Sequence, residues 1–170
     1  MKFTKAVLAA LMMTVITGSV QAATTATLTI NVTFSQQSCD IQVPSSYNLG
    51  FLTQGEIKHH DALNITWTCE GDTPQKTTLT AAIVSGEKAS DEKVYLMTDS
   101  GRTGAMLSLK EKTTGSSIKL TGSGRGDNFC SDAKKDTGMR TCTLIPVTEV
   151  SLDGALGLAS ARLRFEVAYL

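Results

Sequence analysis

Three neighbouring residues, His59, His60 and Asp61, carry side chains of the kinds that bind transition metals. Imidazole and carboxylate groups are common zinc ligands. Adjacent side chains of an extended segment point to opposite sides, so the two histidines could share one ion only across a turn. We therefore predict that the chain has no metal site and needs no cofactor.

A second run, Arg125-Gly126-Asp127, is the tripeptide that integrins recognise. It lies in residues 122–140, a stretch rich in Gly, Asp and Lys that predicts an exposed loop. A given tripeptide occurs by chance in a chain of this length about 2% of the time. An adhesive role for this loop is therefore kept only as an alternative.

The sequence shows no pattern typical of a catalytic nucleophile. The Gly-x-Ser-x-Gly motif, which places a reactive serine on a sharp turn, is absent. We predict that the protein is not an enzyme and has no small-molecule substrate.

The first 22 residues have the pattern of a secretory signal peptide. A basic start is followed by an apolar run from Ala6 to Thr17, too short to span a bilayer, and by the small-x-small cleavage site Val20-Gln21-Ala22. Without Lys2 and Lys5 the chain has 14 Lys and Arg against 16 Asp and Glu, a net charge of about −2. These features predict an exported protein that does not bind nucleic acid.

Four cysteines in an exported chain most simply form two disulfides. Three pairings are possible, and proximity in the sequence favours Cys39–Cys69 and Cys130–Cys142. The second pair would staple the base of the loop at residues 122–140.

The remaining sequence predicts an all-β fold. Thr, Val, Ile and Leu dominate, turn residues recur at short intervals, and no convincing amphipathic helix follows the signal peptide. Pro146 predicts an edge strand or a bulge. Strands are expected at 39–43, 47–52, 62–69, 76–84, 92–98, 105–112, 117–121, 141–150 and 157–169. About six to eight strands after Cys39 suit an immunoglobulin-like sandwich.

The two ends of the exported chain carry the most regular strand patterns. Near the start, apolar residues alternate with Thr and Asn at Ala26, Leu28, Ile30, Val32 and Phe34. Near the end, the alternating face consists of Gly157, Ala159, Ala161, Leu163, Phe165, Val167 and Tyr169, and the printed sequence stops at Leu170. An apolar strand at an open edge invites pairing with another chain. A surplus strand at one end and a missing strand at the other would form a head-to-tail interface that propagates as a filament.

These features resemble the chaperone–usher family of fimbrial (pilus) subunits over the whole exported chain. The resemblance rests on a glycine fourteenth from the end (Gly157) with a penultimate tyrosine (Tyr169), on Cys39 and Cys69, and on the alternating extension before Cys39. It implies an incomplete immunoglobulin-like sandwich that lacks its last strand. The implied parts are a signal peptide (1–22), an N-terminal donor-strand extension (23–38) and a pilin domain (39–170).

The resemblance also implies a mechanism and partners. In the family, a periplasmic pilus chaperone fills a hydrophobic groove beside the C-terminal strand. At the outer-membrane usher, the extension of the next fimbrial subunit replaces the chaperone. Residues 24–34 would then be the donor strand, residues 157–169 one wall of the groove, and the Leu170 carboxylate a contact for chaperone cations. The protein would be part of a fimbrium on the bacterial cell surface and support cell adhesion.

Val32 departs from the family pattern, which usually has glycine seven residues before the first cysteine. A side chain in a pocket shaped for none would clash. Together with the second cysteine pair, this departure favours a minor or adaptor subunit over a shaft subunit. Two alternatives stay open: a single-domain adhesive subunit that acts through residues 122–140, and a monomeric exported sandwich that completes itself with residues 24–34.

Overall fold

The computed structural model describes residues 29–31 and 38–170. The chain divides into two compact units, Met1–Phe34 and Ser35–Leu170. In the first unit, Thr29, Ile30 and Asn31 are exposed and form no strand. The other predicted donor-strand residues (Ala26, Leu28, Val32 and Phe34) and the predicted signal peptide lie outside the described residues.

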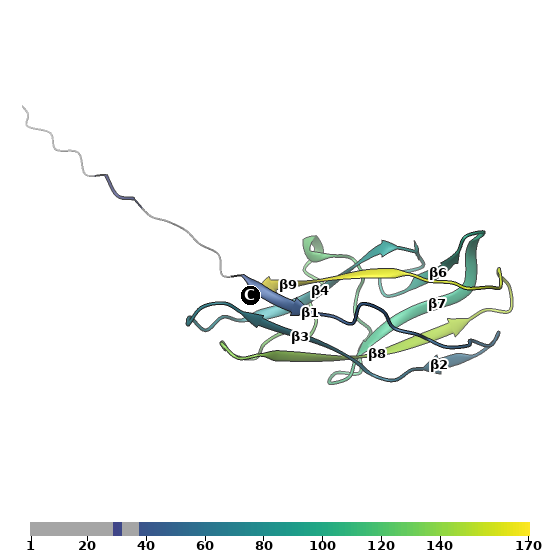
Figure 1. Cartoon of the computed structure of the whole chain (residues 1–170), viewed down its shortest axis with the longest axis horizontal. Coiled ribbons are helices and arrows are strands. Elements are labelled where there is room, and N and C mark those ends of the chain that lie inside the picture. Colours follow the sequence, from purple (N-terminus) through teal and green to yellow (C-terminus); the bar gives the residue numbers. More distant parts are fainter. Residues whose placement is uncertain (1–28, 32–37) are drawn as a thin grey trace, which may run out of the picture. The chain divides into compact units, whose positions relative to one another are not determined.

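The second unit is an all-β sandwich, which confirms the predicted fold class (Figure 1). Its elements are β1 (Cys39–Gln42), β2 (Ile57–His59), β3 (Leu63–Cys69), β4 (Thr77–Ser85), β5 (Glu87–Lys88), β6 (Val94–Thr98), β7 (Gly101–Glu111), the short 3-10 helix η1 (Ser123–Arg125), β8 (Arg140–Val150) and β9 (Arg162–Tyr169). One sheet has the order β1-β3-β8-β7-β6-β5, with β2 also paired to β8, and β4 and β9 form the second sheet. No helix among the residues that the structure describes has the length and hydropathy needed to cross a membrane.

An apolar core lies between the two sheets. Trp67 of β3, Leu79 of β4 and Leu144 of β8 are buried at its centre. Alternate residues of β9 pack against the same core, because successive side chains of a strand point to opposite faces. One of them, Phe165, meets Phe129 edge to face, with 6.4 Å between the ring centroids. The core therefore fixes which face of β9 points inward.

The prediction of an exposed loop at residues 122–140 is wrong for the middle of this segment. Phe129 is buried and exchanges two backbone hydrogen bonds of 3.0 Å with Leu79 of β4. Further bridges join the chain around this segment to Gln75 and Ala82. The segment thereby satisfies backbone groups on the edge of β4 that faces away from β9, which would otherwise need water.

Pro146 also departs from prediction, because it lies within β8 between neighbours on both sides. It is paired with Leu109 of β7, and its carbonyl accepts a hydrogen bond from the backbone N–H of His60 at 2.9 Å. In an antiparallel strand the N–H and C=O of one residue point to the same neighbour. The missing N–H of Pro146 therefore faces the junction between β2 and β3, where the ladder is already interrupted.

Candidate functional site

The C-terminal strand begins later than predicted. Residues 157–161 form no strand, although Ser160 exchanges two backbone hydrogen bonds of 2.9 Å with Met97 of β6. Just before them, Ala155 forms a parallel bridge with Thr103 of β7. The chain thus runs beside the first sheet as far as Ser160 and then crosses to the second sheet, where β9 begins at Arg162.

Within the described part of the chain, β9 has a strand partner on one side only. It pairs with β4 from Ser85 opposite Arg162 to Thr77 opposite Tyr169. Its other side faces residues 43–52, which follow β1. A strand was predicted at 47–52, but the Asn48 side chain accepts a hydrogen bond from the Gly50 N–H at 2.8 Å and Gly50 has a φ of 69°, so this segment turns instead.

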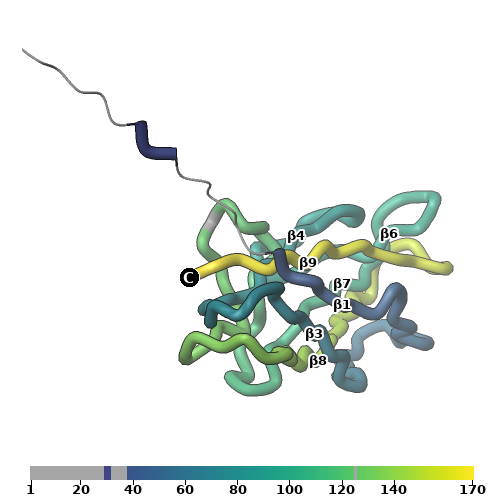
Figure 2. Tube along the Cα trace, turned by 60° about the vertical axis from the view of Figure 1, so that its left-hand side comes forward, coloured from purple at the N-terminus to yellow at the C-terminus, as the bar shows by residue number. Residues whose placement is uncertain are grey.

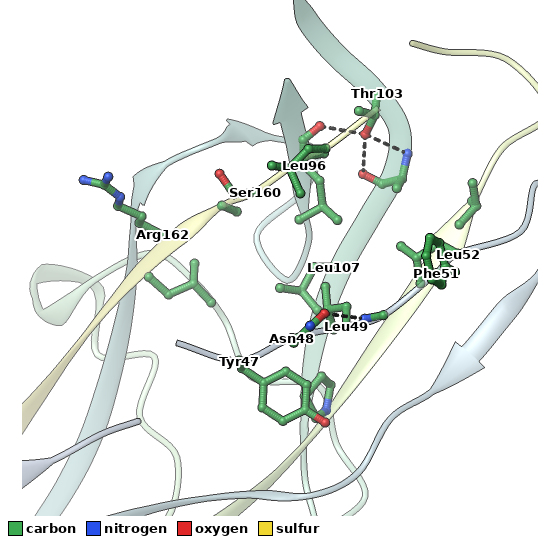
Figure 3. Close-up of a pocket in the computed structure, with 18 of the residues that line it drawn as sticks. Tyr47, Asn48, Leu49, Phe51, Leu52, Leu96, Thr103, Leu107, Ser160 and Arg162 are labelled. Atoms are coloured by element: carbon green, nitrogen blue, oxygen red, sulfur yellow. Dashed lines mark hydrogen bonds between the residues drawn. The ribbon is translucent and has the colours of Figure 1, made fainter. Parts of the chain in front are cut away.

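A groove of about 1090 Å³ separates residues 43–52 from the C-terminal segment (Figure 3). Residues 156–163 and Phe165 form its second wall. In Figure 3, Leu107 lies between Tyr47 and Leu49 on one side and Ser160 and Arg162 on the other. Apolar side chains of the first sheet make the floor, namely Leu63, Leu96, Leu107, Leu109, Pro146 and Val150. An apolar floor between two backbone walls suits an extended peptide.

The groove closes where β1 meets β9. The Tyr169 hydroxyl lies 3.1 Å from Cys39 Sγ and donates to it, since a disulfide sulfur carries no proton. Figure 1 shows the C-terminus next to the start of β1, and Figure 2 shows the start of β1 beside the last part of β9. Of the residues predicted for the groove wall, Gly157, Ala159, Ala161, Leu163 and Phe165 line the groove, whereas Val167, Tyr169 and Leu170 do not.

Large apolar side chains stand exposed on both rims of the groove. Phe51 is 98% exposed on one wall, and Leu158 is 97% exposed on the other, with Leu156 nearby. Single exposed apolar residues are normal on protein surfaces, but their concentration around one groove is typical of a binding surface.

The structure joins Cys39 to Cys69 and Cys130 to Cys142, the pairing that sequence proximity favours. Cys39 and Cys69 are also directly opposite one another in the ladder of β1 and β3. The first disulfide therefore fixes the start of β1, which forms the closed end of the groove. The second ties the segment at 122–140 to β8.

His59, His60 and Asp61 contribute to no cluster of metal ligands among the described residues. His60 Nε2 instead lies 2.8 Å from the Thr148 hydroxyl of β8. Partial burial and then the nearby Lys58 charge lower the pKa of His60, which favours the neutral ring. The contact with Thr148 of β8 gives His60 a structural role.

Asp127 of the Arg125-Gly126-Asp127 tripeptide is bonded within the protein. Its Oδ1 accepts from Lys119 Nζ and its Oδ2 from the Thr121 hydroxyl, both at 2.8 Å. The hydrogen bond and the negative charge of Asp127 raise the pKa of Lys119. A receptor that binds the Asp127 carboxylate would have to displace both of these hydrogen bonds. This cost disfavours the adhesive alternative.

We expect Asp127→Ala to lower the free energy of unfolding by about 1 kcal/mol, because two partly exposed hydrogen bonds are lost. Chemical denaturation would measure this loss. Adhesion of cells that display the protein should not change, nor should it change for the matched variant Asp99→Ala on an exposed turn. A loss of adhesion specific to Asp127→Ala or Asp127→Glu would restore the adhesive alternative.

Comparison with solved structures places this architecture among known folds. The P pilus rod subunit PapA matches with a TM-score of 0.57 and 18% sequence identity, over 78% of this chain and 99% of that chain. A chain from a chaperone–usher pilus structure that concerns rod uncoiling matches with the same TM-score and identity, over 86% of this chain and 96% of that chain. No protein-family model matches the sequence, and no curated protein matches it. The fold is thus the immunoglobulin-like sandwich of pilin structures.

Proposed function

We propose that the protein is a structural subunit of a chaperone–usher pilus whose groove accepts a β-strand from another polypeptide. The groove between residues 43–52 and β9 is the observation that carries this proposal. On this side β9 offers a backbone edge, and the floor beneath it includes the partly exposed apolar side chains of Leu63, Leu107 and Val150. A strand added here would hydrogen-bond to β9 and cover the floor at the same time.

Burial of its apolar face would be the main energetic gain from such a strand. Residues 24–34 carry five apolar side chains on one face. Burying them would contribute about 5–12 kcal/mol before the costs of ordering and association. The same surface left in water would be a site of unspecific association.

The likeness of the fold to two pilus structures supports the proposal. Its partners are then a periplasmic pilus chaperone, an outer-membrane usher and neighbouring fimbrial subunits. The protein would pass through the periplasm and end in a fibre on the bacterial cell surface. Nothing in this role requires a cofactor or a catalytic group.

Chain length limits the alternative in which the protein completes itself. Cys39 lies beside Tyr169, at the closed end of the groove. The eight residues of β9, Arg162–Tyr169, alone span about 25 Å, and Gly157 lies five positions further from Tyr169 along the chain, whereas the five residues from Phe34 to Cys39 reach at most about 18 Å. The protein's own residues 24–34 could therefore enter only parallel to β9, with Phe34 near Phe165.

We further propose that the protein is a minor or adaptor subunit of the pilus. This proposal rests on Val32, at a position where a glycine is expected, and on the Cys130–Cys142 disulfide. The Cys130–Cys142 disulfide is present in the structure, whereas the fit of Val32 depends on the space inside the groove of the receiving subunit.

A synthetic peptide of residues 24–34 tests the proposed function. The full chain would carry Leu28→Asp and Ile30→Asp in its own extension, so that its copies cannot fill one another. We expect the peptide to raise the unfolding temperature by several degrees at a hundredfold excess over its Kd, because it binds the native state only. A peptide with the same two aspartates is the matched control. No shift with this peptide or with other alternating strand peptides would contradict the proposal.

A further inference from the structure

We propose that the edge of β4 that faces away from β9 is a second pairing edge, which the Cys130–Cys142 disulfide keeps closed. When this bond is reduced, residues 129–136 (the covering segment) leave the edge, and the β4 edges of two copies of the chain pair antiparallel. The proposal concerns the side of β4 opposite the groove and does not depend on what the groove binds.

The sequence of β4 gives this edge no protection of its own. Exposed edge strands are usually kept from pairing by charged residues, by proline or by a segment that covers them. From Thr77 to Ser85 the strand reads Thr-Thr-Leu-Thr-Ala-Ala-Ile-Val-Ser, without a charge or a proline. Its ladder with β9 uses one side of the strand. Protection of the other side therefore depends on the covering segment.

The covering segment binds the backbone of every second residue of this edge. The hydrogen-bonded pairs are Gln75 with Asp136, Thr77 with Asp132 and Leu79 with Phe129, at distances of 2.8–3.1 Å. In an antiparallel ladder the N–H and C=O of one residue point to the same neighbour. The groups that the covering segment occupies are therefore the ones that an incoming strand would use.

The covering segment fits the edge irregularly. The chain advances three residues from Phe129 to Asp132 and four from Asp132 to Asp136, whereas β4 advances two residues over each of these intervals. Cys130, in the first interval, has a φ of 48°, a left-handed backbone conformation that is unfavourable for a residue with a side chain. A regular strand would bind the same edge without extra residues and without this conformation.

A buried hydroxyl group indicates which strand fits the edge. Thr80 Oγ1 is buried and has no hydrogen-bond partner within the described part of the chain, which is unfavourable. If Leu79 of one copy lies opposite Leu79 of a second copy, each Thr80 lies opposite the other copy's Thr78 on the same face. The Thr78 hydroxyl, now bonded to the Phe129 carbonyl, becomes available when the covering segment leaves. Threonines opposite one another in a ladder can hydrogen-bond, so a second copy satisfies Thr80.

The disulfide opposes this exchange because it joins the covering segment to β8. Cys142 of β8 is 1% exposed and follows Cys130 by twelve residues, so the segment can move only a short way while the bond is intact. A dithiol reductant supplies two electrons and two protons: the S–S bond breaks, both cysteines become thiols and the dithiol becomes a disulfide. Phe129 and Asp132 then hold the segment without the cross-link, and opening becomes more frequent.

Hydrogen exchange tests whether the disulfide keeps the edge closed. The full chain would carry Leu28→Asp and Ile30→Asp, so that its extension cannot pair, with or without Cys130→Ser and Cys142→Ser. At low protein concentration we expect the serine pair to speed exchange of the Leu79 amide, which is bonded to the covering segment, by about tenfold or more. Amides of β4 that face β9 should change much less. Equal protection of the Leu79 amide in the two chains would overturn the proposal.

Size-exclusion chromatography tests the partner. The chain with the serine pair should form dimers as its concentration is raised, whereas the chain with the disulfide should remain monomeric. Val94→Ala removes buried methyl groups from β6, away from this edge, and is the matched control for lost stability. Dimers of this control would mean that general destabilisation causes the association. That result would overturn the proposal, as would a serine-pair chain that stays monomeric.

Cysteine cross-linking tests the register. One batch of the serine-pair chain would carry Thr78→Cys and another Thr80→Cys. In the proposed register these two positions form a non-hydrogen-bonded pair, whose Cα atoms are close enough for a disulfide. Mild oxidation of the mixed batches should give covalent dimers, and each batch alone should give few. Equal cross-linking within single batches would overturn the register with Leu79 opposite Leu79.

Reduction of the folded chain gives the same test if the serine pair does not fold, which Trp67 fluorescence would reveal. Dithiothreitol is added to the chain with the disulfide, whose Cys130 is partly exposed, and new thiols are alkylated. Mass spectrometry identifies the chains in which the Cys130–Cys142 bond alone is reduced. These chains should show fast exchange of the Leu79 amide and should form dimers. Full protection of Leu79 in them would overturn the proposal.

Discussion

Deletion of residues 24–34 should abolish fibre formation and leave the groove able to bind a peptide. The strand that is donated and the groove that accepts it lie at opposite ends of the chain, so removing the first leaves the second unchanged. Electron microscopy and size-exclusion chromatography should show subunits without fibres. The deleted chain should still gain several degrees in unfolding temperature from added peptide of residues 24–34.

Matched substitutions distinguish the effect of the apolar face of the extension on assembly from the effect of its length. Leu28→Asp with Ile30→Asp should abolish fibres as completely as the deletion does, because two charges would be buried in the groove. Thr27→Asp with Thr29→Asp adds the same charges to the other face of the strand and should retain assembly. A deleted chain that loses several kcal/mol of stability and binds no peptide would instead indicate a strand that completes its own sandwich.

Local periodicity was sufficient to predict most of the fold. The alternation of Leu63, Ile65 and Trp67 predicts β3 with its buried face, and the same pattern in Leu163, Phe165 and Val167 predicts the inward face of β9. Period-two patterns are reliable here because both strands have one face in the core and one towards water. The short strands β2 and β5 carry no such pattern and were not predicted.

The bounds of the groove could not be predicted, because they depend on contacts between distant segments. The sequence pattern continues from Gly157 to Tyr169, but the groove ends at Phe165 since β1 approaches β9 there through Cys39 and Tyr169. Likewise, the overall composition of residues 122–140 predicts an exposed loop, although Phe129 reaches the core. A single phenylalanine among Gly, Asp and Lys was the one available signal. Sequence reasoning also missed the wall at residues 43–52, which it interpreted in part as a strand.

A buried polar network holds the segment at 122–140 against the core. One carboxylate oxygen of Asp132 accepts hydrogen bonds from the Thr77 N–H at 2.8 Å, from the Thr77 hydroxyl at 2.7 Å and from Arg140 Nε at 3.3 Å. The Thr77 hydroxyl in turn accepts from the indole N–H of Trp67 at 2.8 Å. The Arg140 side chain is 7% exposed, so Asp132 is the counter-ion of a buried charge.

Asp132→Ala should therefore destabilise the protein by about 3–5 kcal/mol, because the positive charge of Arg140 stays buried without its partner. Urea unfolding, followed by the fluorescence of the single tryptophan Trp67, would measure the loss. Asp132→Ala combined with Arg140→Met should recover much of it, since the uncompensated charge is then gone. Removal of the exposed pair Arg164 and Glu166 should cost less than about 1 kcal/mol. A loss below about 1 kcal/mol for Asp132→Ala would mean that the carbonyl groups around Arg140, those of Gln75, Asp136 and Gly138, are sufficient to stabilise its charge.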